Sequence, residues 1–343
     1  MTPEQVLDYP LPNPPAPGET REVLPGIKWL RMPLPFALDH INLWLLEQDD
    51  GLVIVDCGLA TDATRALWQE ILDRELRGRA VKRVIATHCH PDHAGLASWL
   101  TERFRVPLTM TQADYLSAHA WRDDAAGFTA KSLVEFYRVN GLDDERLSAL
   151  AFRGNAYRKG VPDFPKRYAR LTDGQTLALG GNAWRVVMGY GHSPEHAALY
   201  CDRLNVLISG DMVLPRISTN IAVQAVEPDG DPLQLFLDSL SRYAQLPVDT
   251  LVLPSHGLPF RGLRERILQL EEHHRLRLAE LEEVCATPRA AGEVIATLFR
   301  RELDTHQLFF AMGEALAHLN RLVATGALAR IDGADGVHRF VRR

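Results

Sequence analysis

Several features that mark whole classes of protein are missing from this chain. No apolar run approaches the ~18–20 residues of a membrane-spanning helix, so we expect no membrane segment. The first residues, Met1 to Gln5, show no basic stretch followed by an apolar one, so we expect no secretory signal. A reduced, cytoplasmic location is the expectation that follows.

Cysteine is scarce, and a serine-hydrolase motif and an excess of positive charge are absent. The four cysteines are scattered and form no C-x-x-C pair, which argues against a disulfide framework or a cysteine-rich zinc module. No G-x-S-x-G motif of a serine hydrolase is present. The 38 Lys and Arg are outnumbered by 44 Asp and Glu, for a net charge of −6, so nothing attracts the chain generally to nucleic acid or to an anionic membrane.

What the chain does contain is apolar patterning across 343 residues, a length that suggests about two domains. We predict a proline-rich extended arm over residues 1–21, a catalytic domain over 22–262 and a smaller domain over 263–343. The strands are predicted at 27–32, 41–46, 52–56, 84–86, 176–179, 184–188, 205–209 and 249–253, and two early helices at 62–76 and 94–104.

Two stretches are predicted to be mainly helical. Residues 112–170 mix helical patterns with glycines, aromatics and basic residues, which indicates a helical insert or lid rather than a sheet layer. The tail contains three helical patterns, near 263–284, 290–301 and 305–324, followed by a hairpin pattern. Three helices and a hairpin are typical of a winged-helix domain.

The segment from Thr87 to His93, with the sequence T-H-C-H-P-D-H, carries the strongest chemical signal. It follows the apolar residues 84–86, and a turn at the end of a strand can direct several side chains to one point. Imidazole and carboxylate groups together suit divalent ions such as Zn²⁺, with Fe, Mn or Ni as alternatives. His88 and His90 could bind one cation, and Asp92 and His93 a second beside it.

Three further candidate ligands each follow an apolar strand pattern. His192 follows residues 184–188, Asp211 follows 205–209, and His256 follows 251–253. A histidine after a strand is commonplace by itself. Four strands that all end in His or Asp indicate side chains that converge along one edge of packed sheets.

These motifs, H-C-H-P-D-H at 88–93, G-H-S-P-E-H at 191–196, S-G-D at 209–211 and P-S-H-G at 254–257, resemble the metallo-β-lactamase superfamily. The match is to the branch that includes hydroxyacylglutathione hydrolases, lactonases and nucleases. The resemblance implies an α+β fold, a four-layer αββα sandwich with a two-metal site at the sheet edges. The tail resembles the winged-helix domain that some of these proteins carry.

Carried over by motif, the resemblance assigns one role to each candidate. His88, His90 and His192 would bind the first metal, Asp92, His93 and His256 the second, and Asp211 would bridge the two. Cys89 stands at a variable position and is not expected to be a ligand. A hydroxide shared by the metals would be the nucleophile. Asp92 would also position this hydroxide and pass a proton to the leaving group.

Four other residues are weaker candidates. Asp56, at a strand end, could accept a hydrogen bond from a ligand imidazole or merely cap the strand. Tyr190 and Asn220 could face substrate. His196 could line the pocket or play a structural part in the next strand.

The expected activity is hydrolysis of a small thioester or ester by a dinuclear metal site, and not true β-lactamase activity, because a fold does not determine its substrate. The alternative is a metal-dependent endoribonuclease or phosphodiesterase. Residues 263–343 hold 12 Arg against 12 Asp and Glu, too near neutrality for a nucleic-acid reader. The tail is instead expected to serve in dimerisation or as a cap. A non-catalytic metal-binding protein is the third and least favoured reading.

Overall fold

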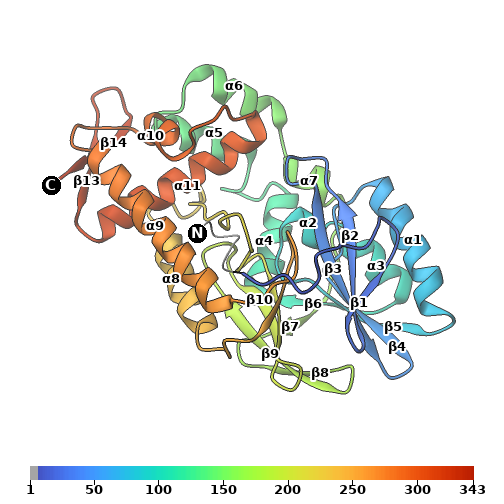
Figure 1. Ribbon diagram of the computed structural model, residues 1–343. Coiled ribbons are helices and arrows are strands. Elements are labelled where there is room, and N and C mark those ends of the chain that lie inside the picture. The colour runs from blue at the N-terminus through green and yellow to red at the C-terminus, as the bar shows by residue number, and fades with distance from the viewer. Residues whose placement is uncertain (1–6) are drawn as a thin grey trace. The chain divides into compact units, whose positions relative to one another are not determined.

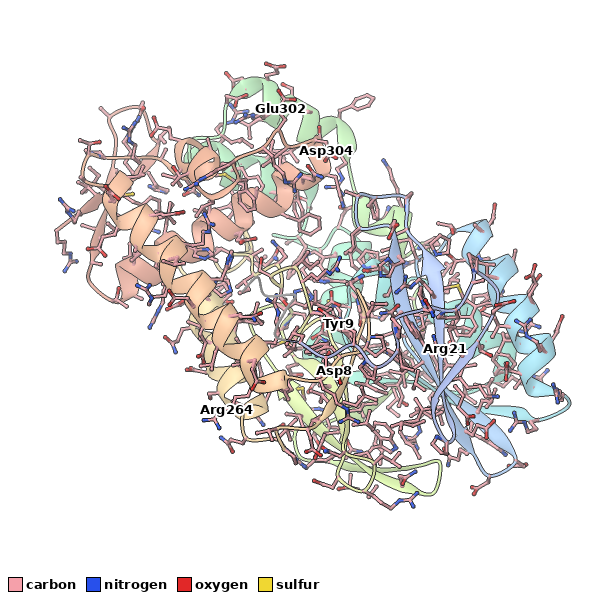
Figure 2. The ribbon with its side chains drawn as sticks, viewed as in Figure 1. Asp8, Tyr9, Arg21, Arg264, Glu302 and Asp304 are labelled. Atoms are coloured by element: carbon pink, nitrogen blue, oxygen red, sulfur yellow. The ribbon has the colours of Figure 1, made fainter. Side chains whose placement is uncertain are left out.

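The computed structural model describes residues 7–343, which form two compact units (Figure 1). The first unit comprises residues 7–122, 157–219 and 239–267. The second comprises residues 123–156, 220–238 and 268–343. Residues 1–6 of the expected N-terminal arm lie outside the described residues. Farther along that arm, Asp8 forms an isolated antiparallel bridge with Arg261 (Figure 2).

The first unit contains two mixed β-sheets. The larger sheet has the strand order β1 (Arg21–Leu24), β2 (Ile27–Pro33), β3 (His40–Gln48), β4 (Gly51–Val55), β5 (Ala80–Ile85), β6 (Leu108–Thr111) and β7 (Tyr168–Leu171). Strands β1 to β4 pair antiparallel, and β4 to β7 pair parallel. The smaller sheet has the order β12 (Leu251–Pro254), β11 (Val206–Gly210), β10 (His196–Cys201), β9 (Asn182–Gly189) and β8 (Thr176–Leu179). Only β11 and β12 pair parallel in this second sheet.

Alternation along the strands divides the interior of this unit into two apolar cores. In β3, Trp44 and Leu46 point into the core between the two sheets, where Trp44 stacks on Trp29 with the ring centres 6.2 Å apart. Leu43 and Leu45 point to the opposite face of the same strand. The first sheet is therefore buried on both faces.

Helices cover the outer faces of the sheets. Helix α1 (Asp62–Leu76) begins where the Thr61 hydroxyl accepts a hydrogen bond from the backbone N–H of Thr64 (3.1 Å), and its buried face includes Trp68. α3 (Ala97–Phe104) and α4 (Gln112–Arg122) pack on the same side of the first sheet. The last residue of α8 (Pro232–Tyr243) donates its hydroxyl to the carbonyl of Val187 in β9 (3.2 Å). The expected αββα sandwich is confirmed.

The second unit is helical apart from one hairpin. Its elements are α5 (Ala130–Val139), α6 (Asp144–Arg153), the first part of α8, most of α9 (Leu263–Val284), α10 (Ala291–Leu298), α11 (Thr305–Ala324), β13 (Leu328–Asp332) and β14 (His338–Arg342). Asp304, labelled in Figure 2, caps α11 by accepting a hydrogen bond from the N–H of Gln307 (2.8 Å). Three helices and a hairpin at the end of the chain are thus confirmed, and the winged-helix assignment stays a prediction.

The structure also contains elements that the sequence did not predict. These are β1, β6, β7 and α8, whereas β10, the strand that begins at His196, was expected without bounds. β7 occupies residues 168–171, so the end of the stretch 112–170 joins the first sheet instead of forming part of a helical insert. Two short helices, α2 (Pro91–Ala94) and α7 (Ala156–Gly160), complete the order of elements. No helix among residues 7–343 is long and apolar enough to cross a membrane.

Candidate metal centre

The side chains predicted as metal ligands lie just beyond the ends of four strands of the first unit. His88 and His90 follow β5, and His192, Asp211 and His256 follow β9, β11 and β12. Asp92 and His93 belong to the short helix α2, which begins with Pro91. The structure gathers them into two groups whose potential ligand atoms lie within 4.8 Å of one another: His88, His90, His192 and Asp211 in one, and Asp92, His93 and His256 in the other.

Asp211 lies between the two groups and offers one oxygen to each. Its Oδ2 atom is 3.4 Å from Nε2 of His192. Its Oδ1 atom is 3.4 Å from Nε2 of His93 and 3.5 Å from Nε2 of His256. Asp92 belongs to the second group, with Oδ2 3.4 Å from Nε2 of His256. This arrangement is the one that a carboxylate shared by two cations requires.

Hydrogen bonds on the far side of the rings determine which imidazole nitrogen faces the site. Nδ1 of His93 donates to Oδ2 of Asp56 (2.8 Å), and Nδ1 of His256 donates to the backbone carbonyl of His40 (2.8 Å). Nδ1 of His88 lies 3.1 Å from the hydroxyl of Thr87, which itself donates to Asp56 (2.9 Å). With Nδ1 protonated, each neutral ring directs the lone pair of Nε2 into the site.

Polar atoms of the site lack the partners that buried groups normally have. Nε2 of His93 and Oδ1 of Asp211 are buried and make no hydrogen bond with any described residue. Nε2 of His88 and Nε2 of His192 face each other at 3.2 Å. A cation between these two nitrogens would bind both. Buried acceptors without donors and imidazoles turned toward one another therefore fit divalent metal ions.

The electrostatics of the two groups differ. Burial lowers the pKa of His256, but Asp211 and Asp92 outweigh it and raise the pKa to about 10. Burial also opposes charge on His93, and nearby carboxylates again raise its pKa well above the ordinary value. In the first group, burial and neighbouring imidazoles lower the pKa of His90 to about 3. The carboxylates thus place negative charge beside His93 and His256 and favour protons on these rings. A bound cation would neutralise the same negative charge and replace those protons.

Asp56 is fully buried at the end of β4 and adopts the left-handed conformation, with φ of 64°. This conformation is uncommon for a residue other than glycine, and such residues cluster at functional sites. Besides His93, the carboxylate accepts hydrogen bonds from the backbone N–H (2.7 Å) and the hydroxyl (2.9 Å) of Thr87. Asp56 therefore holds the ring of His93 directly and reaches His88 through Thr87.

Two residues that the sequence analysis missed support the loop that carries His256. Asn42 is fully buried, and its amide donates to the carbonyls of Pro254 and Gly257, both at 2.9 Å. His40 supplies the carbonyl that orients His256, and Nε2 of its own ring accepts a hydrogen bond from the N–H of Gly257 (3.1 Å). The signal available in the sequence was Asn42, a polar residue flanked by apolar residues in β3.

The remaining predicted residues lie in different surroundings. His196 is fully buried at the start of β10, and its Nε2 accepts a hydrogen bond from the N–H of Asp211 (3.2 Å). Tyr190 is partly buried against the core between the sheets. Asn220 lies in the second unit, where its amide donates to Glu314 (3.3 Å). Cys89 is buried in the core on the helix side of the first sheet and belongs to neither ligand group.

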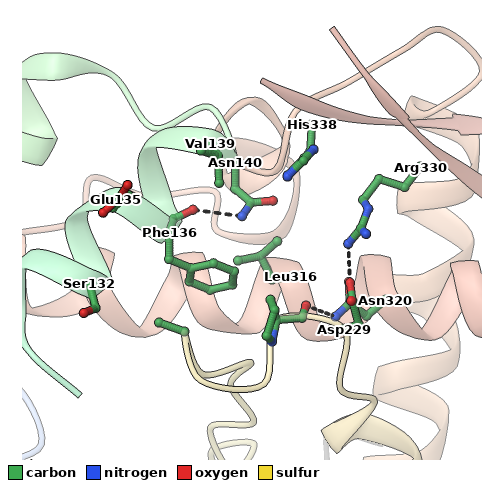
Figure 3. Close-up of a pocket in the computed structure, with 12 residues that line it drawn as sticks. Ser132, Glu135, Phe136, Val139, Asn140, Asp229, Leu316, Asn320, Arg330 and His338 are labelled. Atoms are coloured by element: carbon green, nitrogen blue, oxygen red, sulfur yellow. Dashed lines mark hydrogen bonds and ion pairs between the residues drawn. The ribbon is translucent and has the colours of Figure 1, made fainter. Parts of the chain in front are cut away.

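A cavity of about 370 Å³ lies within the second unit (Figure 3). Phe136, Asn140 and Leu316 are among the residues that line it, and no predicted site residue is. Two of its charged groups, Arg330 and Asp229, are paired with each other. This cavity is separate from the metal centre in its residues and its chemistry.

Two family models match this chain. Residues 37–256 match the model of the metallo-beta-lactamase superfamily, and residues 278–343 match that of the metallo-beta-lactamase-like C-terminal domain. A crystal structure of a beta-lactamase domain protein from Burkholderia ambifaria is similar over 100% of both chains, with 50% identity and a TM-score of 0.93.

Two curated relatives are more distant. The "probable metallo-hydrolase YqjP" of Bacillus subtilis (strain 168) is 28% identical over 87% of this chain and 92% of its own length. A hydroxyacylglutathione hydrolase of Methylobacillus flagellatus is 28% identical over 75% of this chain and 77% of its own. With the family model covering most of the chain and the His and Asp groups in place, the chain belongs to the metallo-beta-lactamase superfamily and is a metal-dependent hydrolase.

Proposed function

We propose that this chain hydrolyses a small thioester or ester at a dinuclear metal centre formed by its seven His and Asp side chains. The observation that carries the proposal is the position of Asp211, whose two oxygens face two different groups of imidazoles at 3.4–3.5 Å. A single-metal site would have no use for that arrangement. The similarity to a hydroxyacylglutathione hydrolase supports a thioester as the substrate class.

The nitrogen and oxygen donors of the site suit Zn²⁺, with Fe or Mn as alternatives. His88, His90 and His192 would hold one ion, Asp92, His93 and His256 the other, and Asp211 both. When bound, two such ions supply a water of lowered pKa and polarise the carbonyl oxygen of the substrate.

Asp92 is the group of this chain best placed to move a proton. Its side chain keeps about 20% of its surface exposed, whereas that of His93 is fully buried. Burial raises the pKa of Asp92, but the neighbouring His93 and His256 outweigh it and lower the pKa to about 2, so the group is ionised and can accept a hydrogen bond from a water molecule. We propose that Asp92 orients the attacking water and then passes a proton to the leaving thiol or alcohol.

The tail is proposed to act as a winged-helix-like cap or dimerisation module and not as a nucleic-acid reader. Helix α11 carries one fixed positive charge, Arg321, and that side chain is paired with Asp231 at 3.1 Å. A helix that bound a phosphate backbone would need several free cations.

The function is tested by assaying acylglutathione and acyl-CoA thioesters, lactones, a β-lactam and single-stranded RNA with Zn²⁺, Fe²⁺ and Mn²⁺ in turn. We expect cleavage of thioesters or esters and little cleavage of the β-lactam. The variant His90→Ala should lose this activity, and His119→Ala, on α4 of the same unit, should keep it. Cleavage of RNA alone would replace the proposal with the phosphodiesterase alternative.

A further inference from the structure

Asp114, in the first turn of α4, joins two of the loops that carry the ligand histidines. It is fully buried, and its Oδ1 atom accepts a hydrogen bond from the backbone N–H of Cys89 (2.8 Å), the residue between His88 and His90. Its Oδ2 atom accepts one from the backbone N–H of Glu195 (2.7 Å) and one from the hydroxyl of Ser193 (3.2 Å). Both of these residues follow His192.

The connection between α4 and the His192 loop is reciprocal. While Asp114 accepts from Glu195, the side chain of Glu195 accepts a hydrogen bond from the backbone N–H of Ala113 (3.0 Å). The first turn of a helix has N–H groups without intrahelical partners and a partial positive charge, so carboxylates are stabilised there. The two loops are thus attached to one rigid point.

Different residues support the second ligand group. Asp56 orients His93, and the amide of Asn42 binds the loop of His256. None of the hydrogen bonds that Asp114 makes goes to these residues. The hydrogen bonds of Asp56 reach both ligand groups, because the hydroxyl of Thr87 connects Asp56 to the ring of His88. The hydrogen bonds of Asp114 reach only the loops of the first group.

We propose that Asp114 is a positioning residue for the first metal position: it holds His88, His90 and His192 in register and sets the affinity of that position, but not of the second, for its cation. The inference rests on the proposed ligand roles. A carboxylate accepts at both oxygens, whereas an asparagine in its place directs an NH₂ group at one of the N–H or O–H donors. One loop must then move away, and loss of such a supporting residue typically lowers metal affinity about 10–100-fold.

The test compares parent and Asp114→Asn proteins loaded with Zn²⁺ and titrated with a chromophoric chelator, with the zinc retained per chain counted at each step. We expect the variant to release one of two zinc ions at about 10–100-fold higher free Zn²⁺ and the other unchanged. Asp173→Asn is the matched control, because that carboxylate also accepts a backbone N–H, from Met188 (2.9 Å), in the same unit. It should leave both zinc affinities as in the parent.

Double variants identify the position that is weakened. In a His256→Ala background, which removes a ligand of the second group, Asp114→Asn should still lower the affinity of the remaining zinc. In a His90→Ala background, Asp114→Asn should not change the affinity of the remaining zinc. Equal weakening of both positions, or of neither, would overturn the inference. If Asp114→Asn does not fold, Ser193→Ala deletes only the 3.2 Å bond and should weaken the same position to a smaller extent.

The two proposals fail in different ways. A parent protein that retains two zinc ions with the expected selectivity but cleaves no thioester or ester would refute the proposed substrate class and leave the role of Asp114 standing. Thioester cleavage by the parent, together with zinc affinities that are the same in parent and Asp114→Asn, would support the proposed substrate class and refute the role of Asp114.

Discussion

Both compact units bury histidines, but the surroundings of these histidines differ. In the first unit, His93 and His256 lie beside carboxylates that raise the pKa of each ring. In the second unit, His274 and His318 are fully buried and bond to each other, with Nδ1 of His274 donating to Nε2 of His318 (3.1 Å). Burial and neighbouring imidazoles or cations lower the pKa of His274 to about 2 and that of His318 to about 4.

The comparison shows what distinguishes a metal centre from a histidine core. Nδ1 of His318 donates to the carbonyl of Glu314 (2.8 Å), so each ring of the pair has a definite neutral tautomer and a neighbour to bind. No ligand group of His, Cys, Asp or Glu is found there among residues 7–343. Carboxylates that carry negative charge, and not the number of imidazoles, mark the first unit as the one built for cations.

The largest effect is expected from Asp211→Ala, which removes the carboxylate that faces both ligand groups. Metal content should fall from two ions per chain, and hydrolysis should drop by more than the roughly 100-fold that loss of a supporting residue causes. Elemental analysis and the thioester assay measure the two losses. Asp202→Ala, a change at an exposed aspartate before β11, is the control and should keep both metals and the activity. An Asp211→Ala protein that kept both metals would contradict the contrast between the two units.

The histidine pair should make the second unit sensitive to acid. Because the folded pKa of His274 is about 2, the unfolded chain takes up a proton that the folded chain refuses once the pH falls below about 6.5. The free energy of unfolding should therefore decrease by about 1.4 kcal/mol per pH unit for each such ring below that value. Between pH 7 and pH 5, the free energy of unfolding measured in urea should fall by about 2 kcal/mol less in His274→Leu than in the parent.

Leu276→Gln, a change at an exposed and uncharged residue of α9, is the control for this measurement and should lose stability in acid as the parent does. An acid sensitivity that is the same in parent and His274→Leu would mean that the pair is protonated in the folded state, and the contrast between the units would lose its basis.

Glu314 lies in the same helix as His318, α11, and should give the free energy of unfolding the opposite pH dependence. Burial raises its pKa to about 7, against the hydrogen bond from Asn220 and the charge of Arg277, which lower it. Since an ordinary glutamate ionises near 4.5, the free energy of unfolding should decrease as the pH rises from about 4.5 to 7. Glu314→Gln should therefore stabilise the protein by about 1–2 kcal/mol at pH 8 and have little effect at pH 4.5. Glu302→Gln, an exposed carboxylate, should change neither value.

The smallest expected effect concerns the cap of α11. Asp304→Ala removes the acceptor for the N–H of Gln307 and should lower the free energy of unfolding by about 1 kcal/mol. Thermal unfolding measures this loss, and metal content should not change, because the cap and the ligand groups belong to different units. A parallel loss of zinc would show that the two units do not behave as separate structures.

The grouping of the candidate ligands could be predicted from the sequence because each one follows a short apolar strand. Strand, turn and polar side chain are local features, and packing brings the strand ends together without further information. The long helices α9 and α11 were equally legible, since their apolar positions recur with helical spacing over 22 and 20 residues.

The supporting residues could not be predicted in this way. Asp114 binds groups 25 and 81 positions away in the chain, and nothing in its own neighbourhood marks it. His40 orients His256 through a backbone carbonyl, which any residue could supply. β6 was missed because it has four residues, Leu108-Thr-Met-Thr, and both threonines are buried although their polar side chains suggest a surface.

The second unit is formed by three separate segments of the chain, residues 123–156, 220–238 and 268–343. This arrangement has a consequence for folding during synthesis. During synthesis the first two segments leave the ribosome long before the tail, and the buried side chains of α11, such as Met312 and Leu316, emerge only at the end. We expect apolar side chains of α5 and α6, such as Phe136 and Leu147, to stay uncovered until then and to depend on chaperones. Truncation of the tail should accordingly yield aggregated protein instead of a smaller enzyme.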